Sequence, residues 1–199
     1  MTESQRKKFT EYDKPYICIG ICNQGERHAI EIPWRSHAGV MNMKTPSVYF
    51  EEADLHDPEI MARLNSLQIL GCYIFHELKD YSFLANRGFH YLRDLYIRKG
   101  KNFESLVFTY GKNDLMMLLL EDMHLPSLEG IPEQFLFSKI CHNPIYLALV
   151  NCQIENIECL CSNEVLLSEL VVVGTNEEQR WKQVPAMQYS YYESSSTQP

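Results

Sequence analysis

The sequence predicts an α/β protein in which a mixed sheet, with a β-hairpin at its start, is flanked by helices. Two apolar runs, Tyr16–Cys22 and His28–Trp34, surround the segment Asn23–Glu26, and a glycine-containing turn between such runs is typical of a hairpin. A later apolar run stops at Tyr110-Gly111 and restarts at Leu115, as in a strand followed by a helix. Strands that come first and then alternate with helices indicate a sheet with helical cover.

The middle of the chain adds one strand and two helical regions. A third, shorter strand is predicted at Val48–Phe50. The pair Asp57-Pro58 is typical of an N-cap and a first helical residue, and apolar spacing carries this helix through Leu67. Helical spacing resumes over Ile74–Lys99, with one interruption, and Gly100 ends it.

The second half predicts further elements of both kinds. After the strand from Leu106 and the helix from Leu115, a loop with two prolines covers Leu125–Phe137. A last helix is predicted over Pro144–Cys161. The apolar run Val165–Val173 fits either an extension of that helix or a final strand.

These elements define the domain organisation. Residues 1–14 are polar and are expected to be disordered, residues 15–173 form one domain, and residues 174–199 are a polar, Tyr/Ser-rich flexible tail. A chain of 199 residues suits one domain of this kind.

Composition limits the function classes. The net charge of −8 argues against a general basic nucleic-acid binder. There is no apolar run of membrane-spanning length and no secretory signal, so we expect a cytoplasmic or nuclear protein without a membrane partner. The seven cysteines are then expected to be reduced thiols.

Asp114 is the one acid at the junction between the Leu106 strand and the Leu115 helix. Ligands and metals bind at such strand ends in open α/β sheets. This junction resembles the second motif of the DEDDh 3′–5′ exonucleases. Ile19–Gly25 with Ala29–Ile32 resembles the family's first motif, and Tyr146–Cys152 falls in the frame of the third. The resemblance covers most of residues 16–161 and implies an RNase H-like fold.

The resemblance also places the family's other metal-binding positions. Gly20 and Cys22 stand where the first-motif Asp and Glu belong, Tyr146 stands for the general-base His, and Asn151 stands for the last Asp. Two-metal hydrolysis needs oxygen ligands for two clamped ions. Glycine offers no ligand, Asn a weak one, and a thiol is too soft for Mg²⁺. Three of the four expected acids are therefore absent, and the resemblance implies a catalytically inactive relative.

The resulting hypothesis is an inactive exonuclease-like binding or assembly module in RNA handling, with no cofactor. Exuperantia- and Maelstrom-type proteins are precedents for this fold without the standard acids. Single-stranded RNA and protein partners are expected, with a homodimer as a candidate assembly. Phosphate contacts would come from a local basic group: Arg87, Arg93, Arg98, Lys99 and Lys101.

Two other function classes remain open. The first is an active nuclease that binds Mg²⁺ or Mn²⁺ through rearranged ligands such as Asp114, Glu31 and Glu155. The second is a protein-interaction domain whose Tyr-rich tail is a docking peptide, and the acidic net charge favours this class over RNA binding.

Simpler roles also account for the marked residues. Asp114 suits an N-cap of the Leu115 helix. A zinc site is a further candidate, although its spacing is unusual and free cysteine on a helix behaves as a small buried hydrophobe: Cys141, His142, Cys152, Cys159 and Cys161.

Overall fold

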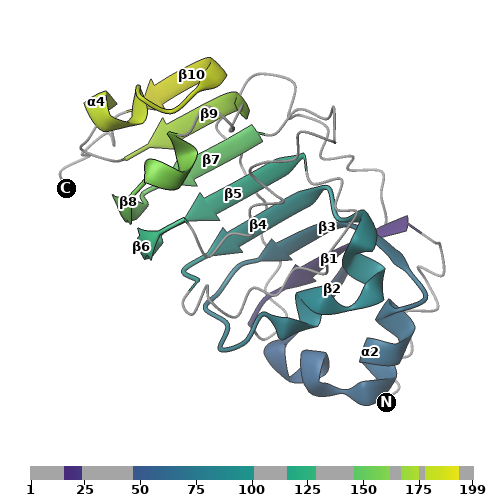
Figure 1. Ribbon diagram of the computed structural model, residues 1–199. Helices are drawn as coiled ribbons and strands as arrows, with labels where there is room; N and C mark the ends of the chain where they lie inside the picture. The colour runs from purple at the N-terminus through teal and green to yellow at the C-terminus, as the bar shows by residue number, and fades with distance from the viewer. Residues whose placement is uncertain are drawn as a thin grey trace.

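The structure is a computed structural model that describes residues 16–23, 47–100, 116–128, 146–161, 167–174 and 178–192. Its centre is one sheet of eight parallel strands, and a parallel pair of short strands forms a second sheet (Figure 1). Helices in the described part of the chain are few and short. The α/β class that the sequence predicts is therefore confirmed.

The strands of the large sheet are arranged largely in chain order. In space they run β2-β1-β3-β4-β5-β7-β9-β10, so from β3 onward each strand lies beside the one before it in this sheet. The bounds in the large sheet are β1 (Tyr16–Ile21), β2 (Ser47–Phe50), β3 (Gln68–Ile74), β4 (Asp94–Arg98), β5 (Met117–Glu121), β7 (Tyr146–Val150), β9 (Leu167–Val173) and β10 (Ala186–Tyr192). The second sheet contains β6 (His124–Ser127) and β8 (Gln153–Asn156), which follow β5 and β7 directly.

The helical elements lie in the connections. The two α-helices are α2 (Pro58–Leu64) and α4 (Glu178–Trp181). Among the described residues the 3-10 helices are η1 (Glu52–His56), η2 (Ser82–Ala85), η3 (Arg87–Tyr91) and η5 (Glu158–Leu160).

One face of the large sheet carries two continuous rows of apolar side chains, and we call it the aliphatic face. Each row consists of register partners on adjacent strands, and its side chains are almost completely buried in the main core. Burial of one such side chain stabilises the fold by about 1.5–3 kcal/mol. The rows are Val48, Ile19, Cys72, Leu95, Leu118, Leu147 and Leu170, and Phe50, Ile21, Ile74, Ile97, Leu120, Leu149 and Val172.

The opposite face, which we call the mixed face, carries aromatic, small and ionisable residues because successive strand residues point to opposite sides. Gly20 belongs to it, and a Cβ atom there would lie 2.6 Å from the ring of Tyr49. Because Gly20 has no side chain, it leaves the space over the strand that the Tyr49 ring occupies. The other members on the central strands are Cys18, Tyr73, Asp94, Tyr96, Met117, Leu119, Tyr146, Ala148, Glu169 and Val171.

Two local predictions are confirmed near the N-terminal edge. The strand expected at Val48–Phe50 is β2, and the helix expected from Asp57-Pro58 is α2. The Asp57 carboxylate accepts hydrogen bonds from the backbone N–H groups of Glu59 and Ile60, at 2.8 and 3.4 Å. Asp57 is thus a true N-cap. The helix ends at Leu64, short of the predicted Leu67, and β3 follows.

Three predicted helices are wrong over the described residues. The apolar run after Leu115 is strand β5, the region ending at Lys99 contains η2, η3 and strand β4, and Pro144–Cys161 contains β7, β8 and η5. The physical reason is that strands buried on both faces lose the alternation that marks a strand in sequence. Short apolar runs of this kind cannot be told from buried helix segments by periodicity.

The RNase H-like arrangement is not confirmed. β1 pairs in parallel with β2 on one side and with β3 on the other, so both of its edges are occupied by parallel strands. This leaves no edge for an antiparallel hairpin partner of Tyr16–Cys22. The predicted second hairpin strand, His28–Trp34, lies outside the described residues.

The sheet also extends beyond the predicted domain boundary at residue 173. Val165–Val173 proves to hold strand β9, and β10 continues the sheet to Tyr192 within the segment predicted as a flexible tail. β6 likewise falls at the start of the predicted Leu125–Phe137 loop. Residues 1–14, the Leu106 strand and the tail after residue 192 lie outside the described residues.

Candidate binding edge

Four consecutive strands of the large sheet end in the same way. The residue directly after each strand adopts a positive φ, which non-glycine residues rarely do and which Asn and Asp adopt most readily. The φ angles are 54° at Lys99, 53° at Asp122, 52° at Asn151 and 73° at Gly174. The chain therefore repeats one local structure after β4, β5, β7 and β9.

A hydrogen-bond ladder connects these four positions. Each left-handed residue donates its backbone N–H to the carbonyl of the last residue of the next strand. The donor–acceptor distances are 2.9 Å from Lys99 to Glu121, 2.9 Å from Asp122 to Val150, 2.8 Å from Asn151 to Val173 and 2.9 Å from Gly174 to Tyr192. The sheet thus continues one residue past its strands, and these four residues occupy neighbouring positions along its edge.

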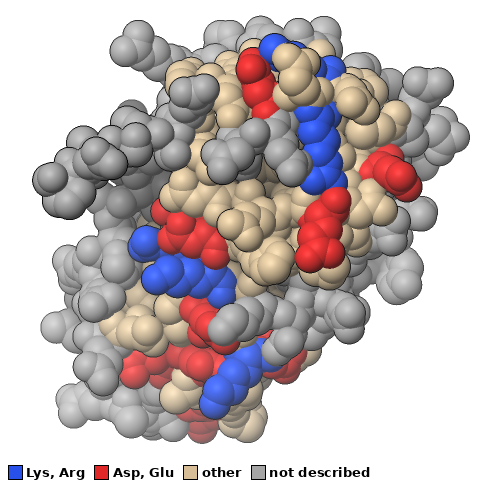
Figure 2. Space-filling view, turned by 90° about the vertical axis from the view of Figure 1, so that its left-hand side faces the viewer, with Lys and Arg blue, Asp and Glu red and all other residues tan. Residues whose placement is uncertain are grey.

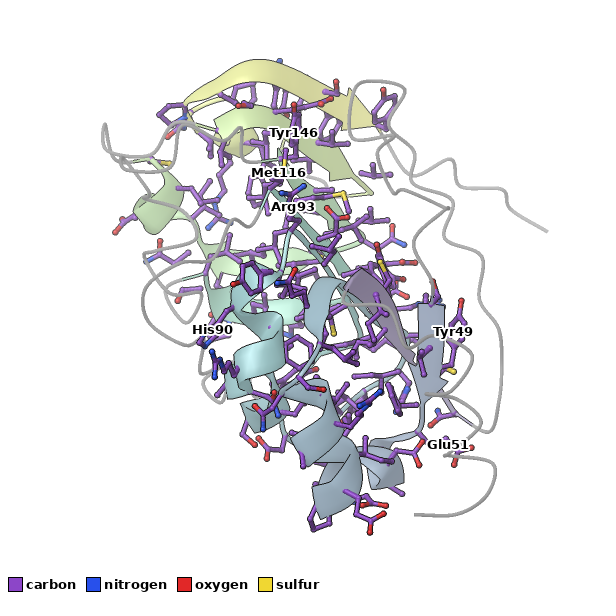
Figure 3. All side chains as sticks on the ribbon, turned by 90° about the vertical axis from the view of Figure 1, so that its right-hand side faces the viewer. Tyr49, Glu51, His90, Arg93, Met116 and Tyr146 are labelled. Atoms are coloured by element: carbon purple, nitrogen blue, oxygen red, sulfur yellow. The ribbon has the colours of Figure 1, made fainter. Side chains whose placement is uncertain are left out.

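A matching ladder exists at the amino ends of the strands. Arg93 donates its N–H to Leu70, Met116 donates to Arg93, and Tyr146 donates to Met116, at 2.8, 2.8 and 2.7 Å. Figure 3 shows the labelled residues Arg93, Met116 and Tyr146 one above another on this side of the molecule. Both ends of the repeated strand are therefore held in register by backbone bonds.

At the carboxyl ends the side chains also form a network. The Nε of Arg98 donates to Oδ2 of Asp122 at 3.2 Å, and the Nδ2 of Asn151 donates to Oδ1 of the same carboxylate at 3.2 Å. Arg98 also lies 3.6 Å from a carboxylate oxygen of Glu121, which accepts a hydrogen bond from the hydroxyl of Tyr96. We call Arg98, Lys99, Glu121, Asp122 and Asn151 the carboxyl edge.

The carboxyl edge combines both signs of charge at a half-exposed surface. The Arg98 side chain is 36% exposed and those of Glu121 and Asp122 are 26% and 27% exposed. Burial, and then its hydrogen bond to Glu121, raise the pKa of Tyr96, so its hydroxyl remains a donor. Figure 2 shows basic and acidic side chains beside one another on the side toward which the strands of Figure 1 point. Such a surface fits a partner with mixed polar groups.

The amino half of the mixed face holds a second polar group of side chains. Gly71 leaves the space that the Tyr73 hydroxyl and the Cys18 thiol occupy, since a Cβ there would lie 2.6 Å and 2.9 Å from them. Burial raises the pKa of Asp94 to about 6, and burial together with the Asp94 charge raises the pKa of Cys18 to about 11. The Cys18 thiol is thus protonated and a poor nucleophile at neutral pH.

The residues matched to exonuclease catalytic positions do not converge in space. Gly20 and Cys22 belong to β1 and the residue after it, whereas Tyr146 and Asn151 flank β7, four strands away in the sheet. Four strand spacings amount to about 19 Å, and the two ends of β7 are about 17 Å apart. A two-metal centre holds its ions about 4 Å apart. Asp114, the retained acid, lies outside the described residues.

The basic residues proposed for phosphate contacts are also dispersed. Arg93 precedes β4, Arg98 and Lys99 end it, and Arg87 begins η3. Arg98 is already engaged by two carboxylates. Among these residues the structure therefore brings only Arg98 and Lys99 together, at the end of β4. Lys101 lies outside the described residues.

The cysteine and histidine candidates for zinc have other positions. The Cys152 thiol is buried and lies 3.3 Å from the carbonyl oxygen of Leu120 and 3.4 Å from that of Val150, as a weak donor to both strands. Cys141 and His142 lie outside the described residues. Within the ranges that the structure describes, there is no group of three or more potential metal ligands.

Sequence reasoning did not single out Glu121 or Asp122. A signal for the carboxyl edge exists, however. The left-handed positions 99, 122, 151 and 174 are separated by 23, 29 and 23 residues, and each follows an apolar run. Aligning the chain with itself at offsets of 23 and 29 residues would have found them.

Comparison with known proteins adds no relative. No protein-family model, curated protein or solved structure matches this chain. In the described part of the chain, no helix has the length and apolar character needed to cross a membrane.

Proposed function

We propose that this chain is a non-catalytic binding module built from stacked strand-and-turn units, and that its carboxyl edge contacts a protein partner. The observation that carries the proposal is the repeated left-handed residue after four consecutive strands, each tied to the next strand by a backbone hydrogen bond. Repeated units place side chains at regular intervals along one edge, which suits an extended contact surface.

The sequence around the central strands supports a repeat architecture. Leu115-x-x-Leu118-x-Leu120-x-x-Met123-x-Leu125 and Pro144-x-x-Leu147-x-Leu149-x-x-Cys152-x-Ile154 align with each other. Both resemble the Leu-x-x-Leu-x-Leu-x-x-Asn/Cys-x-Leu pattern of leucine-rich repeats, whose period is 20–29 residues. The buried thiol of Cys152, which donates to the preceding strand, supports the same interpretation.

Charge favours protein over nucleic acid as the partner. A nucleic-acid site needs a basic stripe that neutralises phosphates. At the carboxyl edge the Arg98 cation is matched by the carboxylates of Glu121 and Asp122, and the chain carries a net charge of −8. RNA handling by an exonuclease-like module remains the alternative that the sequence resemblance suggests.

Two exposed residues of the carboxyl edge allow a direct test. We expect Lys99→Glu combined with Asn151→Lys to reduce recovery of the partner in quantitative affinity purification, because these side chains lie in the proposed contact row. Arg87→Glu on η3 is the matched control and is expected to leave recovery unchanged. Circular dichroism of each variant establishes that it is folded.

The alternative function makes a different prediction in the same experiment. RNA binding through the basic residues would be weakened by Arg87→Glu as well as by Lys99→Glu, most strongly at low salt. Degradation of single-stranded RNA that requires Mn²⁺ and is lost in Asp114→Ala would overturn the non-catalytic proposal.

A further inference from the structure

The two outer strands of the large sheet differ in ways that matter for association. β2 has four residues and is followed directly by the acidic residues Glu51 and Glu52. β10 has seven residues, Ala-Met-Gln-Tyr-Ser-Tyr-Tyr, with no charge and no proline. Short strands, charges and prolines are the usual protection of a sheet edge against pairing. β10 is therefore the longer of the two edges and carries no charge within the strand, although Pro185 precedes it and Glu193 follows it in the sequence.

β10 is also an edge that can accept a further strand. Among the strands that the structure describes, β9 is its single neighbour, and their parallel register extends from Ala186 to Tyr192. Tyr and other aromatic residues favour strand pairing. Tyr192, at the end of β10, is 47% exposed and is one of two large hydrophobic residues that lie open among the described residues.

We propose that β10 pairs with β10 of a second copy of this chain, as antiparallel strands around a two-fold axis. A two-fold interface requires a surface that complements itself. With Tyr189 opposite its own copy, Ala186 lies opposite Tyr192, and Gln188 lies opposite Ser190. The pairing brings no charge against a like charge, and it joins two eight-stranded sheets into one continuous sheet.

The aromatic residues of β10 favour pairing with β10 of a second copy over pairing with an unrelated strand. Tyr189 and Tyr191 already pack at the margin of the main core, so their backbone positions are fixed before pairing. Aromatic pairs directly opposite each other across antiparallel strands stabilise the pairing. The Tyr189 pair on the axis is such a contact, and it exists only between two copies.

Substitution of Ser190 tests the pairing. Two copies of residue 190 lie diagonally across the axis, about 7–8 Å apart. We expect the wild-type chain to show a concentration-dependent monomer–dimer equilibrium in sedimentation equilibrium, and Ser190→Lys and Ser190→Glu each to be monomeric because like charges face each other. An equimolar mixture of the two variants should restore the dimer. Ser66→Lys, on the exposed turn before β3 and therefore several strands away from β10, should dimerise as the wild type does.

The mixture separates loss of the interface from loss of the fold, since unfolded variants would not recover on mixing. A wild-type chain that stays monomeric throughout the concentration range would overturn the proposal. Dimerisation of both Ser190 variants with wild-type affinity would do so as well, because the contact would then lie elsewhere.

Discussion

The two faces of the large sheet are made by the same strands but differ in chemistry. The aliphatic face is two unbroken rows of apolar side chains. The mixed face, also largely buried, includes Tyr73, Tyr96, Asp94 and Glu169. Burial of apolar groups stabilises a fold, whereas burial of ionisable groups costs free energy unless they are paired. The difference indicates that the aliphatic face holds the fold together, and that the mixed face and its edges carry the groups with other roles.

The largest effect is expected on the aliphatic face. Leu147 is completely buried at the centre of one apolar row, and its neighbours there are Leu118 and Leu170. Leu147→Ala should lower the free energy of unfolding by about 2–5 kcal/mol, because the truncation leaves a cavity between adjacent strands. Urea denaturation measures this loss. An effect below that of the exposed control Lys182→Ala would contradict the role assigned to this face.

On the mixed face, neutralising a buried acid should raise the free energy of unfolding, whereas truncation on the aliphatic face lowers it. Because burial raises the pKa of Asp94 to about 6, the folded state binds its proton more tightly than the unfolded state. The stability that the folded state gains from holding this proton is fully present below pH 4 and is lost as pH rises through 6. Asp94→Asn should therefore be more stable than the wild type by about 1–3 kcal/mol at pH 7.

The pH dependence provides the control for that prediction. Stability of Asp94→Asn and wild type should converge as the pH falls below 4, where both side chains are neutral. Asp80 has a pKa lowered by hydrogen bonds from Ser82, so Asp80→Asn should instead lose stability above its folded pKa. A constant difference between Asp94→Asn and wild type from pH 3 to pH 8 would show that the Asp94 charge is not the cause.

Gly20→Ala tests whether the mixed face is as closely packed as the aliphatic face. The added methyl group would lie 2.6 Å from the Tyr49 ring, so the ring or strand has to move, at a cost of about 1–3 kcal/mol. Thermal unfolding measures the loss. Combining Gly20→Ala with Tyr49→Ala should cost less than the sum of the two changes, and strict additivity would argue against the contact.

Tyr96→Phe is expected to have a smaller effect, confined to the carboxyl edge. It removes the hydrogen bond to Glu121 and should lower stability by about 1 kcal/mol. The Glu121 carboxylate keeps its ion pair with Arg98, which limits the loss. Chemical denaturation gives the change in stability, and Tyr91→Phe, an exposed tyrosine, is the matched control.

The smallest effect is expected at a left-handed position. Lys99→Gly relieves the strain of φ 54°, so we expect a gain of about 0.5–1 kcal/mol in the free energy of unfolding. Asp122→Gly relieves the same strain but loses the hydrogen bonds to Arg98 and Asn151, and should be destabilising. Equal effects of the two substitutions would indicate that the side-chain network at the carboxyl edge contributes little.

Elements that are stabilised by contacts between residues close together in the chain could be predicted from the sequence. The helix α2 was predicted because Asp57 caps it through the N–H groups two and three residues later, and β2 was predicted from its own short apolar run. The α/β class was also predicted, although three of the helices expected from periodicity are strands or 3-10 turns. These features depend on contacts within a few residues, so a single segment contains the information.

Only the tertiary structure decided between strand and helix in the second half. Met117–Glu121 and Tyr146–Val150 bond to each other and to strands more than twenty residues away, and neither run shows alternation, because both of its faces are buried. The carboxyl edge has the same origin, since Arg98, Asp122 and Asn151 meet only when three strands align. The sequence by itself determined the local caps, the apolar runs and the charge of this protein. The strand register that aligns these features along the carboxyl edge arises from hydrogen bonds between segments far apart in the chain. No single segment specifies which other segment it will pair with.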